Sequence, residues 1–276
     1  MKPATLILRT LLAWFALILA QIIANVIVPI SVPVVRGALS WLLLTYFLTV
    51  AILAYIAQHA DLRGWKLGFA LAVIPAAIAL TNFIEGAVFL KGGLLSWPRL
   101  AAQTLLTYLL VAPVWGVLFG RRPAGDSQVH PLAGRSSAEK LWRFVVSDVS
   151  YIVLYYTAGT IIFPYVRDFY ATQTLPSMPT IVALQLLVRG PIFVVLCLWI
   201  VRLLGLSRLS GAVATGLCFT MLSGFLPLLI PNPIFPDAVR WVHMAEVTSS
   251  NFVFAFFVAW IWTSSPAHAV ALPRAA

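Results

Sequence analysis

Apolar segments long enough to cross a lipid bilayer recur along this chain, and they constrain its fold more than any other feature. A membrane-spanning helix needs about 20 predominantly apolar residues. Eight such segments lie near residues 5–29, 35–57, 66–90, 100–119, 142–164, 180–203, 209–230 and 239–262. They are too long and too continuously apolar for strands of a membrane barrel, and in lipid a helix satisfies its own backbone hydrogen bonds. The sequence therefore predicts an all-α polytopic membrane protein with about eight transmembrane helices.

The composition excludes several other classes of protein. Of the 276 residues, 62% are hydrophobic and only 9% are charged, against about 25% charged in an ordinary soluble domain. A soluble enzyme, a disordered protein and a nucleic-acid-binding module are therefore excluded, and the predicted partners are membrane lipids and a small solute or ion. The two cysteines, Cys197 and Cys218, lie within apolar segments and show neither disulfide nor metal-ligand spacing.

The distribution of basic residues predicts the orientation of the chain. With both termini on the same side, 12 of the 18 Lys and Arg residues fall on that side. Because cytoplasmic loops carry the excess of positive charge, we expect both termini to be cytoplasmic in a multi-pass protein of the plasma (inner) membrane. The first apolar segment continues to Pro29 without a signal-peptidase site, so we expect a retained first helix.

A polar stretch divides the chain into two halves. Residues 121–141 are predicted to form a cytoplasmic linker between an N-terminal four-helix half, residues 1–120, and a C-terminal four-helix half, residues 142–276, within one membrane domain. Short similarities connect the halves, such as the Arg-Gly dipeptides at Arg36 and Arg189. They are too weak to decide whether the halves are a true duplication, which would make them parallel repeats.

Ionisable residues within the spans are the candidates for function. A charge near the bilayer centre costs at least about 2.5–3.5 kcal/mol, so it is retained with a partner, with water or for a purpose. Five such residues fall at similar depth in the predicted outer leaflet: Arg36, Glu85, Arg189, His243 and Glu246. We take them as candidates for binding or proton coupling. Polar residues at helical spacing could support them: Gln21, Asn25, Asn82, Gln185, Ser250 and Asn251.

Each candidate also has a simpler explanation. Arg36 follows a proline closely, and it could extend to the headgroups. Glu85 could form a structural ion pair, and Arg189 could be interfacial or, if the sixth helix began near Pro191, a loop residue. A helix break at Pro191 is the functional alternative, since it would place Arg189 and loose backbone next to a cavity. His243 and Glu246 form a His-x-x-Glu pair that occurs once, which is not the dinuclear carboxylate pattern. We therefore expect neither a metal nor a cofactor.

Three functions are consistent with this pattern. The first, which we favour, is transport of a small solute or ion, with Glu85 or Glu246 carrying a proton and Arg36 or Arg189 holding an anionic group. The second is a membrane-embedded enzyme acting on a lipid-linked substrate, with His243 as general base. The third is a structural or assembly protein whose charges form a dry, paired network. Catalytic residues cannot be assigned from the sequence, and it contains no nucleotide-binding, zinc-protease or serine-hydrolase motif.

Overall fold

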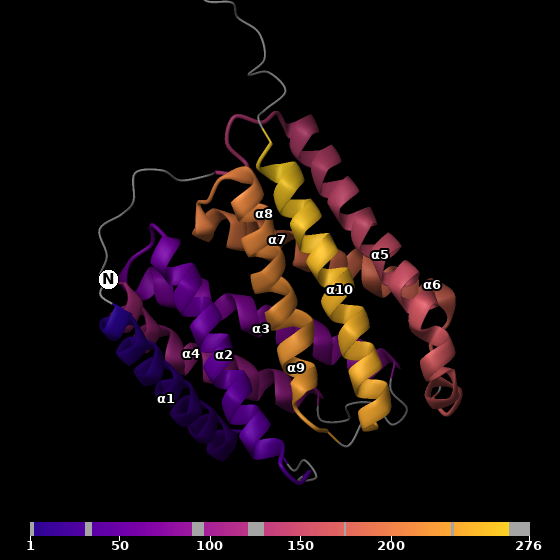
Figure 1. The fold of residues 1–276 in the computed structure, drawn as a ribbon, viewed down its shortest axis with the longest axis horizontal. Helices are drawn as coiled ribbons and strands as arrows, with labels where there is room; N and C mark the ends of the chain where they lie inside the picture. The colour runs from indigo at the N-terminus through magenta and orange to yellow at the C-terminus, as the bar shows by residue number, and fades with distance from the viewer. Residues whose placement is uncertain are drawn as a thin grey trace, which may run out of the picture.

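The fold is an all-helical bundle, seen in a computed structural model that describes residues 3–30, 35–89, 97–120, 130–173, 175–232 and 235–264. Eight helical segments in these ranges are long and apolar enough to cross a membrane, which confirms the predicted polytopic helical class. The first half contains α1 (Pro3–Ile27), α2 (Ala38–His59), α3 (Gly64–Phe89) and α4 (Trp97–Phe119). The second contains α5 (Ser137–Ala171), α6 (Met178–Leu184), α7 (Gly190–Leu204), α8 (Arg208–Thr220), α9 (Leu226–Leu229) and α10 (Asp237–Trp262). Figure 1 shows α1 and α5 at opposite edges of the bundle.

Two π-helical turns join the short helices of the second half into continuous spans. Gln185–Arg189 connects α6 to α7, and Met221–Phe225 connects α8 to α9. A proline follows each turn, Pro191 in α7 and Pro227 in α9. Proline cannot donate a backbone hydrogen bond, and a local change of helical pitch lets the helix continue past it. The break considered near Arg189 is therefore a π turn inside an unbroken span, a feature often found at functional sites.

Helix α5 extends beyond the apolar span at residues 142–164 at both ends. It has 35 residues and begins at Ser137, because the side chain of Ser136 caps it by accepting a hydrogen bond from the backbone N–H of Glu139 at 3.1 Å. It also continues through Pro164, which the sequence suggested as its end. Residues 137–141 of the predicted linker therefore belong to α5. Residues 121–129 lie outside the described part of the chain.

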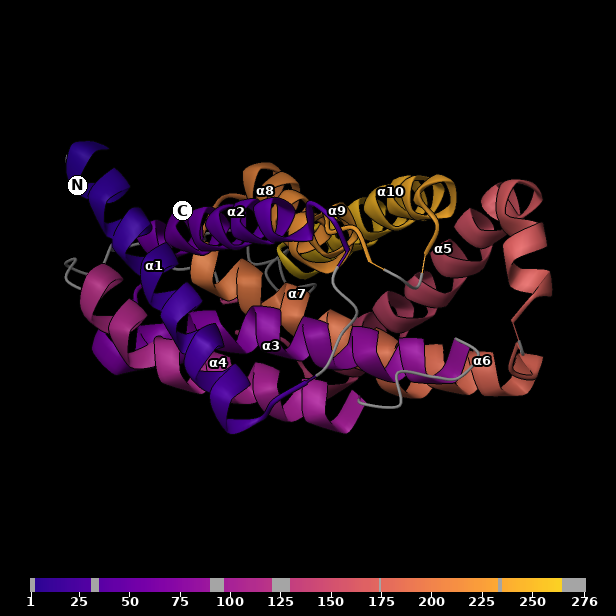
Figure 2. The same ribbon diagram turned by 90° about the horizontal axis from the view of Figure 1, so that it is seen from below.

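The two halves have the same order of neighbours. In the first half, α1 packs against α2 and α4, and α4 packs against α3; in the second, α5 packs against α7 and α10, and α10 packs against α8. The halves meet along α2 and α3 on one side and α7, α9 and the second π turn on the other. Figure 2 shows α1 and α4 at one end and α5 and α6 at the other.

Helices α3 and α4 make the closest contact in the bundle's first half. A Cβ atom built on Gly68 would lie 1.9 Å from the backbone oxygen of Ala112, and one on Gly116 would lie 2.5 Å from that of Gly64. Backbones this close require glycine, since packing between membrane helices depends on small residues rather than on a hydrophobic driving force. The tight contact lies at the start of α3, and Asn82 and Glu85 lie near its other end.

A polar cluster ties the start of α5 to the end of α10. Arg135 and Arg143 both pair with Glu139, with 2.9 Å between Arg143 Nε and Glu139 Oε1. The same two arginines donate to carbonyl groups at the end of α10, among them that of Trp262 at 2.9 Å. We call this side of the bundle the linker side. The opposite side, where α3 and α5 end and α10 begins, is called the pocket side.

Candidate functional site

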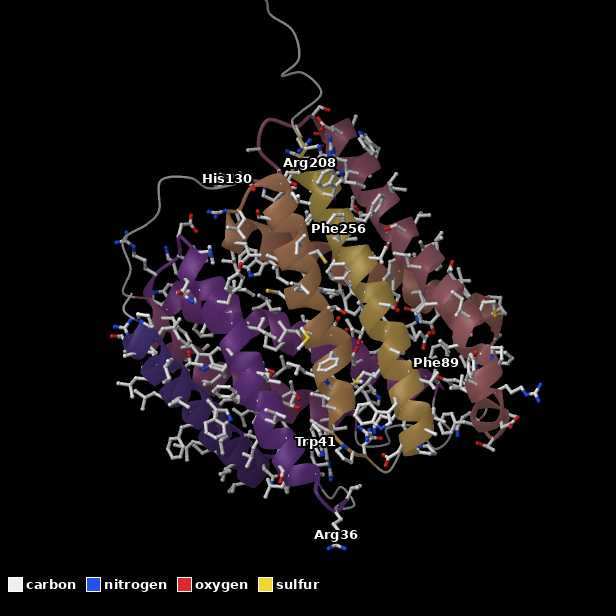
Figure 3. The ribbon with its side chains drawn as sticks, viewed as in Figure 1. Arg36, Trp41, Phe89, His130, Arg208 and Phe256 are labelled. Atoms are coloured by element: carbon white, nitrogen blue, oxygen red, sulfur yellow. The ribbon has the colours of Figure 1, made fainter. Side chains whose placement is uncertain are left out.

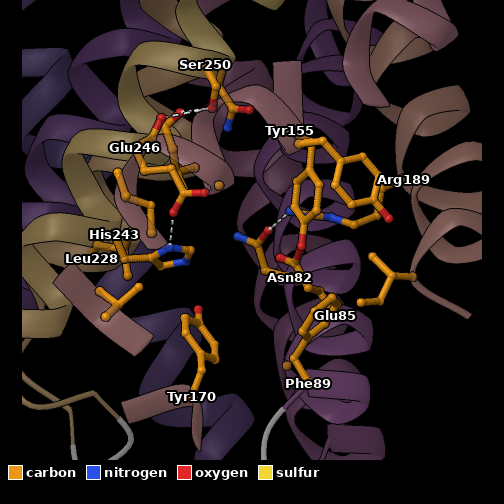
Figure 4. Close-up of a pocket in the computed structure, with 18 of the residues that line it drawn as sticks. Asn82, Glu85, Phe89, Tyr155, Tyr170, Arg189, Leu228, His243, Glu246 and Ser250 are labelled. Atoms are coloured by element: carbon orange, nitrogen blue, oxygen red, sulfur yellow. Dashed lines mark hydrogen bonds and ion pairs between the residues drawn. The ribbon is translucent and has the colours of Figure 1, made fainter. Parts of the chain in front are cut away.

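A cavity of about 530 Å³ opens on the pocket side of the second half. Its walls come from the end of α3, the second half of α5, the α6 span, the region around α9 and the first half of α10. Aromatic and aliphatic side chains form most of its surface, and four ionisable side chains border it (Figure 4). These four are Glu85, Arg189, His243 and Glu246. The cavity therefore collects ionisable groups from three different spans.

Arg189 and Glu85 form an ion pair on one wall. The π turn places Arg189 so that its second terminal nitrogen donates to Asn82 Oδ1 at 3.1 Å, while Gln185 donates to Glu85 Oε1 at 3.2 Å. The guanidinium also lies 5.0 Å from the ring centre of Phe193, a cation–π distance. Arg189 is only 4% exposed. Its positive charge is therefore already compensated by the protein.

His243 and Glu246 form the second polar pair, on α10. His243 Nδ1 lies 2.8 Å from Glu246 Oε2, one helical turn away, and Ser250 donates to the backbone oxygen of Glu246 at 2.9 Å. Glu246 Oε1 has no hydrogen-bond partner among the described residues, and it faces Gly159 of α5, where a Cβ atom would lie 3.6 Å away. The absence of a side chain at Gly159 leaves space in front of this carboxylate.

An aromatic cluster closes the cavity toward the linker side. Tyr151 borders the cavity, and its ring centre lies 5.3 Å from that of Phe193 and 5.1 Å from that of Phe254. Phe219 completes the cluster at 5.0 Å from Phe193. The three phenylalanines are fully buried. These rings therefore separate the cavity from the linker side in this conformation.

Asp148 lies beyond this cluster, about one turn from Tyr151 on α5. It is buried, but its Oδ1 has no hydrogen-bond partner among the residues described and lies against Gly190.

Seven of the eleven predicted site residues border the cavity. They are Glu85, Arg189, His243, Glu246, Asn82, Ser250 and Asn251. Gln185 is fully buried behind the wall and reaches Glu85. Asn251 donates to Ser223 Oγ at 2.8 Å at the inner end of the cavity. Most of the residues predicted from depth and helical spacing therefore lie around one cavity.

Three predicted residues lie elsewhere. Arg36 precedes α2 and is exposed, and in Figure 3 it points away from the bundle. It does not join the cluster because it lies at the very start of its span, as the headgroup explanation expects. Gln21 and Asn25 belong to a separate network in the first half. There, Gln21 accepts from Tyr46 at 3.1 Å, and Asn25 accepts from Gln103 at 2.9 Å.

The sequence analysis missed the aromatic lining of the cavity. Phe89, Tyr155, Phe163, Tyr170 and Phe235 all border it. Tyrosine is frequent along the fifth span, and this was the signal available. It was not informative alone, because tyrosines near the ends of membrane helices are commonly interfacial anchors.

Comparison of the chain with protein-family models, with curated proteins and with solved structures finds no match. The class that fold and site define is a polytopic helical membrane protein with a cavity bordered by ionisable groups. Any more specific function has to be argued from the geometry of the cavity.

Proposed function

We propose that this protein transports a small solute or ion across the membrane, and that the cavity between α5 and α10 is its binding site. The observation that carries this proposal is that Glu85, Arg189, His243 and Glu246 border one cavity. Its volume, about 530 Å³, lies in the range of small-molecule sites, about 300–1,000 Å³. Substrate sites of many transporters lie within the membrane beside irregular helical segments, and Arg189 belongs to such a segment, the π turn between α6 and α7.

Glu246 is the group best placed to exchange a proton or to contact the solute. Glu85 is committed to Arg189 and Gln185, whereas Glu246 has one side-chain partner, His243, through one of its two oxygens. Its other oxygen faces the space beside Gly159. A carboxylate with one free oxygen inside a cavity can take up a proton or a cation without the loss of an existing ion pair.

A purely structural role is less well supported. It predicts a dry network in which all charges are paired and sealed. Arg189 and Glu85 fit that description in part, but Glu246 and His243 border open space, with His243 23% exposed at its side chain. The proposal also retains the predicted orientation, in which the linker side is cytoplasmic because it carries more Lys and Arg.

The His243–Glu246 pair supports a second candidate, an enzyme that acts on a lipid-linked substrate. Because Nδ1 of His243 contacts Glu246, Nε2 is the ring nitrogen left to act as a general base. The apolar walls would suit a lipid chain. Cells that carry His243→Ala should then accumulate an altered lipid, whereas an unchanged lipid profile would contradict this second candidate.

Side-dependent labelling of a cysteine tests the transport proposal without knowledge of the solute. Ser250→Cys places a thiol in the cavity, and Ser249→Cys is a matched control at the same depth on an exposed surface of α10. The native Cys197 and Cys218 are buried, so the wild type provides the background. The reagent is a membrane-impermeant maleimide added to either side of sealed vesicles.

A transporter alternates between two conformations, so a cavity residue becomes accessible from both sides. We expect Ser250→Cys to react rapidly from the pocket side and slowly, but measurably, from the linker side. We expect Ser249→Cys to react slowly from both. Reaction of Ser250→Cys from the pocket side alone, under every condition tried, would indicate a binding or catalytic cavity and would contradict transport.

A further inference from the structure

We propose that the cavity binds an amphipathic organic cation, such as a quaternary ammonium or phosphonium ion bearing apolar groups. This inference names the class of solute for the proposed transport. Only the movement of the solute across the membrane rests on the proposed function. The binding itself stands on the charges and aromatic rings that line the cavity.

The charge balance of the cavity does not favour an anion. Among the described residues, its ionisable groups are Glu85, Arg189, Glu246 and His243. The ion pair of Arg189 and Glu85 cancels, which leaves Glu246 and a histidine. The formal charge is therefore −1 with a neutral imidazole and zero with a protonated one. In neither state does the cavity carry a surplus of positive charge.

The hydrogen-bond donors of Arg189, the one cavity residue expected to hold an anion, are also unavailable. The two terminal nitrogens of Arg189 bind Glu85 and Asn82, and its Nε is fully buried without a partner, out of reach of a ligand. The expectation that Arg189 holds an anionic group therefore loses its geometric basis. Arg36, the other residue expected to do so, lies outside the cavity.

The lining of the cavity suits a cation with few hydrogen-bond donors. Tyr155, Tyr170, Phe163 and Phe235 border it from α5 and from the segment before α10. Aromatic faces attract cations through their quadrupole, and cages of aromatic rings recognise quaternary ammonium groups. One carboxylate, Glu246, supplies the counter-charge. Apolar substituents of the ligand would replace water along the remaining walls.

Gly159 provides the space next to that counter-charge. Its nearest non-local atom is Glu246 Oε1, at 3.6 Å from the position that a Cβ would take. This is ordinary van der Waals contact, so alanine should be tolerated there. A leucine would extend into the space in front of the carboxylate. The pair Gly159→Ala and Gly159→Leu therefore separates loss of space from loss of fold.

The experiment compares two ions of nearly the same shape and opposite charge. Saturable binding of tetraphenylphosphonium and of tetraphenylborate is measured with the protein in lipid nanodiscs, and empty nanodiscs are the blank. We expect the phosphonium to bind at least about tenfold more tightly than the borate, a difference of ~1.4 kcal/mol. Absence of saturable phosphonium binding, or equal binding of both ions, would overturn the inference.

The variants locate the binding in the cavity. Glu246→Gln should weaken phosphonium binding by about tenfold or more, since it removes a partly desolvated counter-charge. Asp168→Asn is the matched control, because Asp168 is an exposed carboxylate on α5 outside the cavity, and it should bind as the wild type does. If Glu246→Gln does not fold, Gly159→Leu should lose binding while Gly159→Ala keeps it. Unchanged binding in Glu246→Gln, or equal binding in both Gly159 variants, would contradict the inference.

The outcomes separate this inference from the proposed transport. Cation-selective binding that depends on Glu246, without alternating access of Ser250→Cys, would leave the ligand class standing and remove the transport function. Alternating access without cation-selective binding would leave the transport function standing and remove the ligand class. Uptake by proteoliposomes of a quaternary ammonium ion that does not cross protein-free bilayers, absent in Glu246→Gln, is expected if both hold.

Discussion

The ion pair between Arg189 and Glu85 should respond unequally to removal of either partner. The side chain of Arg189 is 5% exposed, whereas that of Glu85 is 21% exposed and borders the cavity. Glu85→Leu leaves a buried guanidinium without its counter-charge, which typically costs about 3–5 kcal/mol of unfolding free energy. Arg189→Leu leaves a carboxylate that can still contact cavity water and Gln185, so we expect a smaller loss of about 1–2 kcal/mol.

The double variant Glu85→Leu/Arg189→Leu completes the thermodynamic cycle. Replacement of a buried ion pair by apolar side chains is often close to neutral, so we expect it to unfold within about 1.5 kcal/mol of the wild type. The assay is reversible unfolding in mixed micelles titrated with denaturing detergent, followed by tryptophan fluorescence. Equal losses in the two single variants, or additive losses in the double variant, would refute the reasoning about burial and pairing.

Two further predictions concern the scaffold around the site. Gly68→Ala should destabilise the bundle by about 1–3 kcal/mol, because a Cβ there would meet the backbone oxygen of Ala112 at 1.9 Å. Its melting temperature should lie well below that of Gly159→Ala. Equal melting temperatures of the two variants would argue against the tight contact. In the loop between α2 and α3, the hydrogen bond from Arg202 lowers the pKa of Asp61 below its ordinary value of 3.8. The stabilisation from this carboxylate is therefore complete above about pH 4 and is lost as the pH falls through the lowered pKa. Asp61→Asn should melt slightly below the wild type at neutral pH and equally at strongly acidic pH, and a constant difference across the pH range would contradict this assignment.

Length and apolar character were sufficient to predict the eight spans, because the cost of exposed backbone in lipid leaves few alternatives. Boundaries were less predictable where proline was read as a terminator. Pro164 lies inside α5, and Pro191 follows a π turn rather than a break. Neighbouring helices and local changes of pitch satisfy the freed backbone groups, and such compensation is not visible in a single sequence.

The candidate site was partly predictable for a related reason. Depth in the membrane follows from position along a span, so Glu85, Arg189 and Glu246 could be placed at one level. Lateral position depends on how the helices pack, which explains why Gln21 has the same predicted depth but belongs to a separate network with Tyr46. The pairing of Arg189 with Glu85 changes the electrostatics of the site, and only the packed structure reveals it.

The central claim is that Glu85, Arg189, His243 and Glu246 border one water-accessible cavity, and hydroxyl-radical footprinting of the wild-type protein in nanodiscs tests it most directly. Tyr155 and Tyr170 border the cavity, whereas Tyr46 and Tyr108 lie in the first half and outside it. We predict rapid oxidation of Tyr155 and Tyr170, slow oxidation of Tyr46 and Tyr108, and protection of the first pair by tetraphenylphosphonium. If all four tyrosines were oxidised equally slowly without added ligand, the surroundings of Tyr155 and Tyr170 would be as dry as those of Tyr46 and Tyr108. That result would contradict the account.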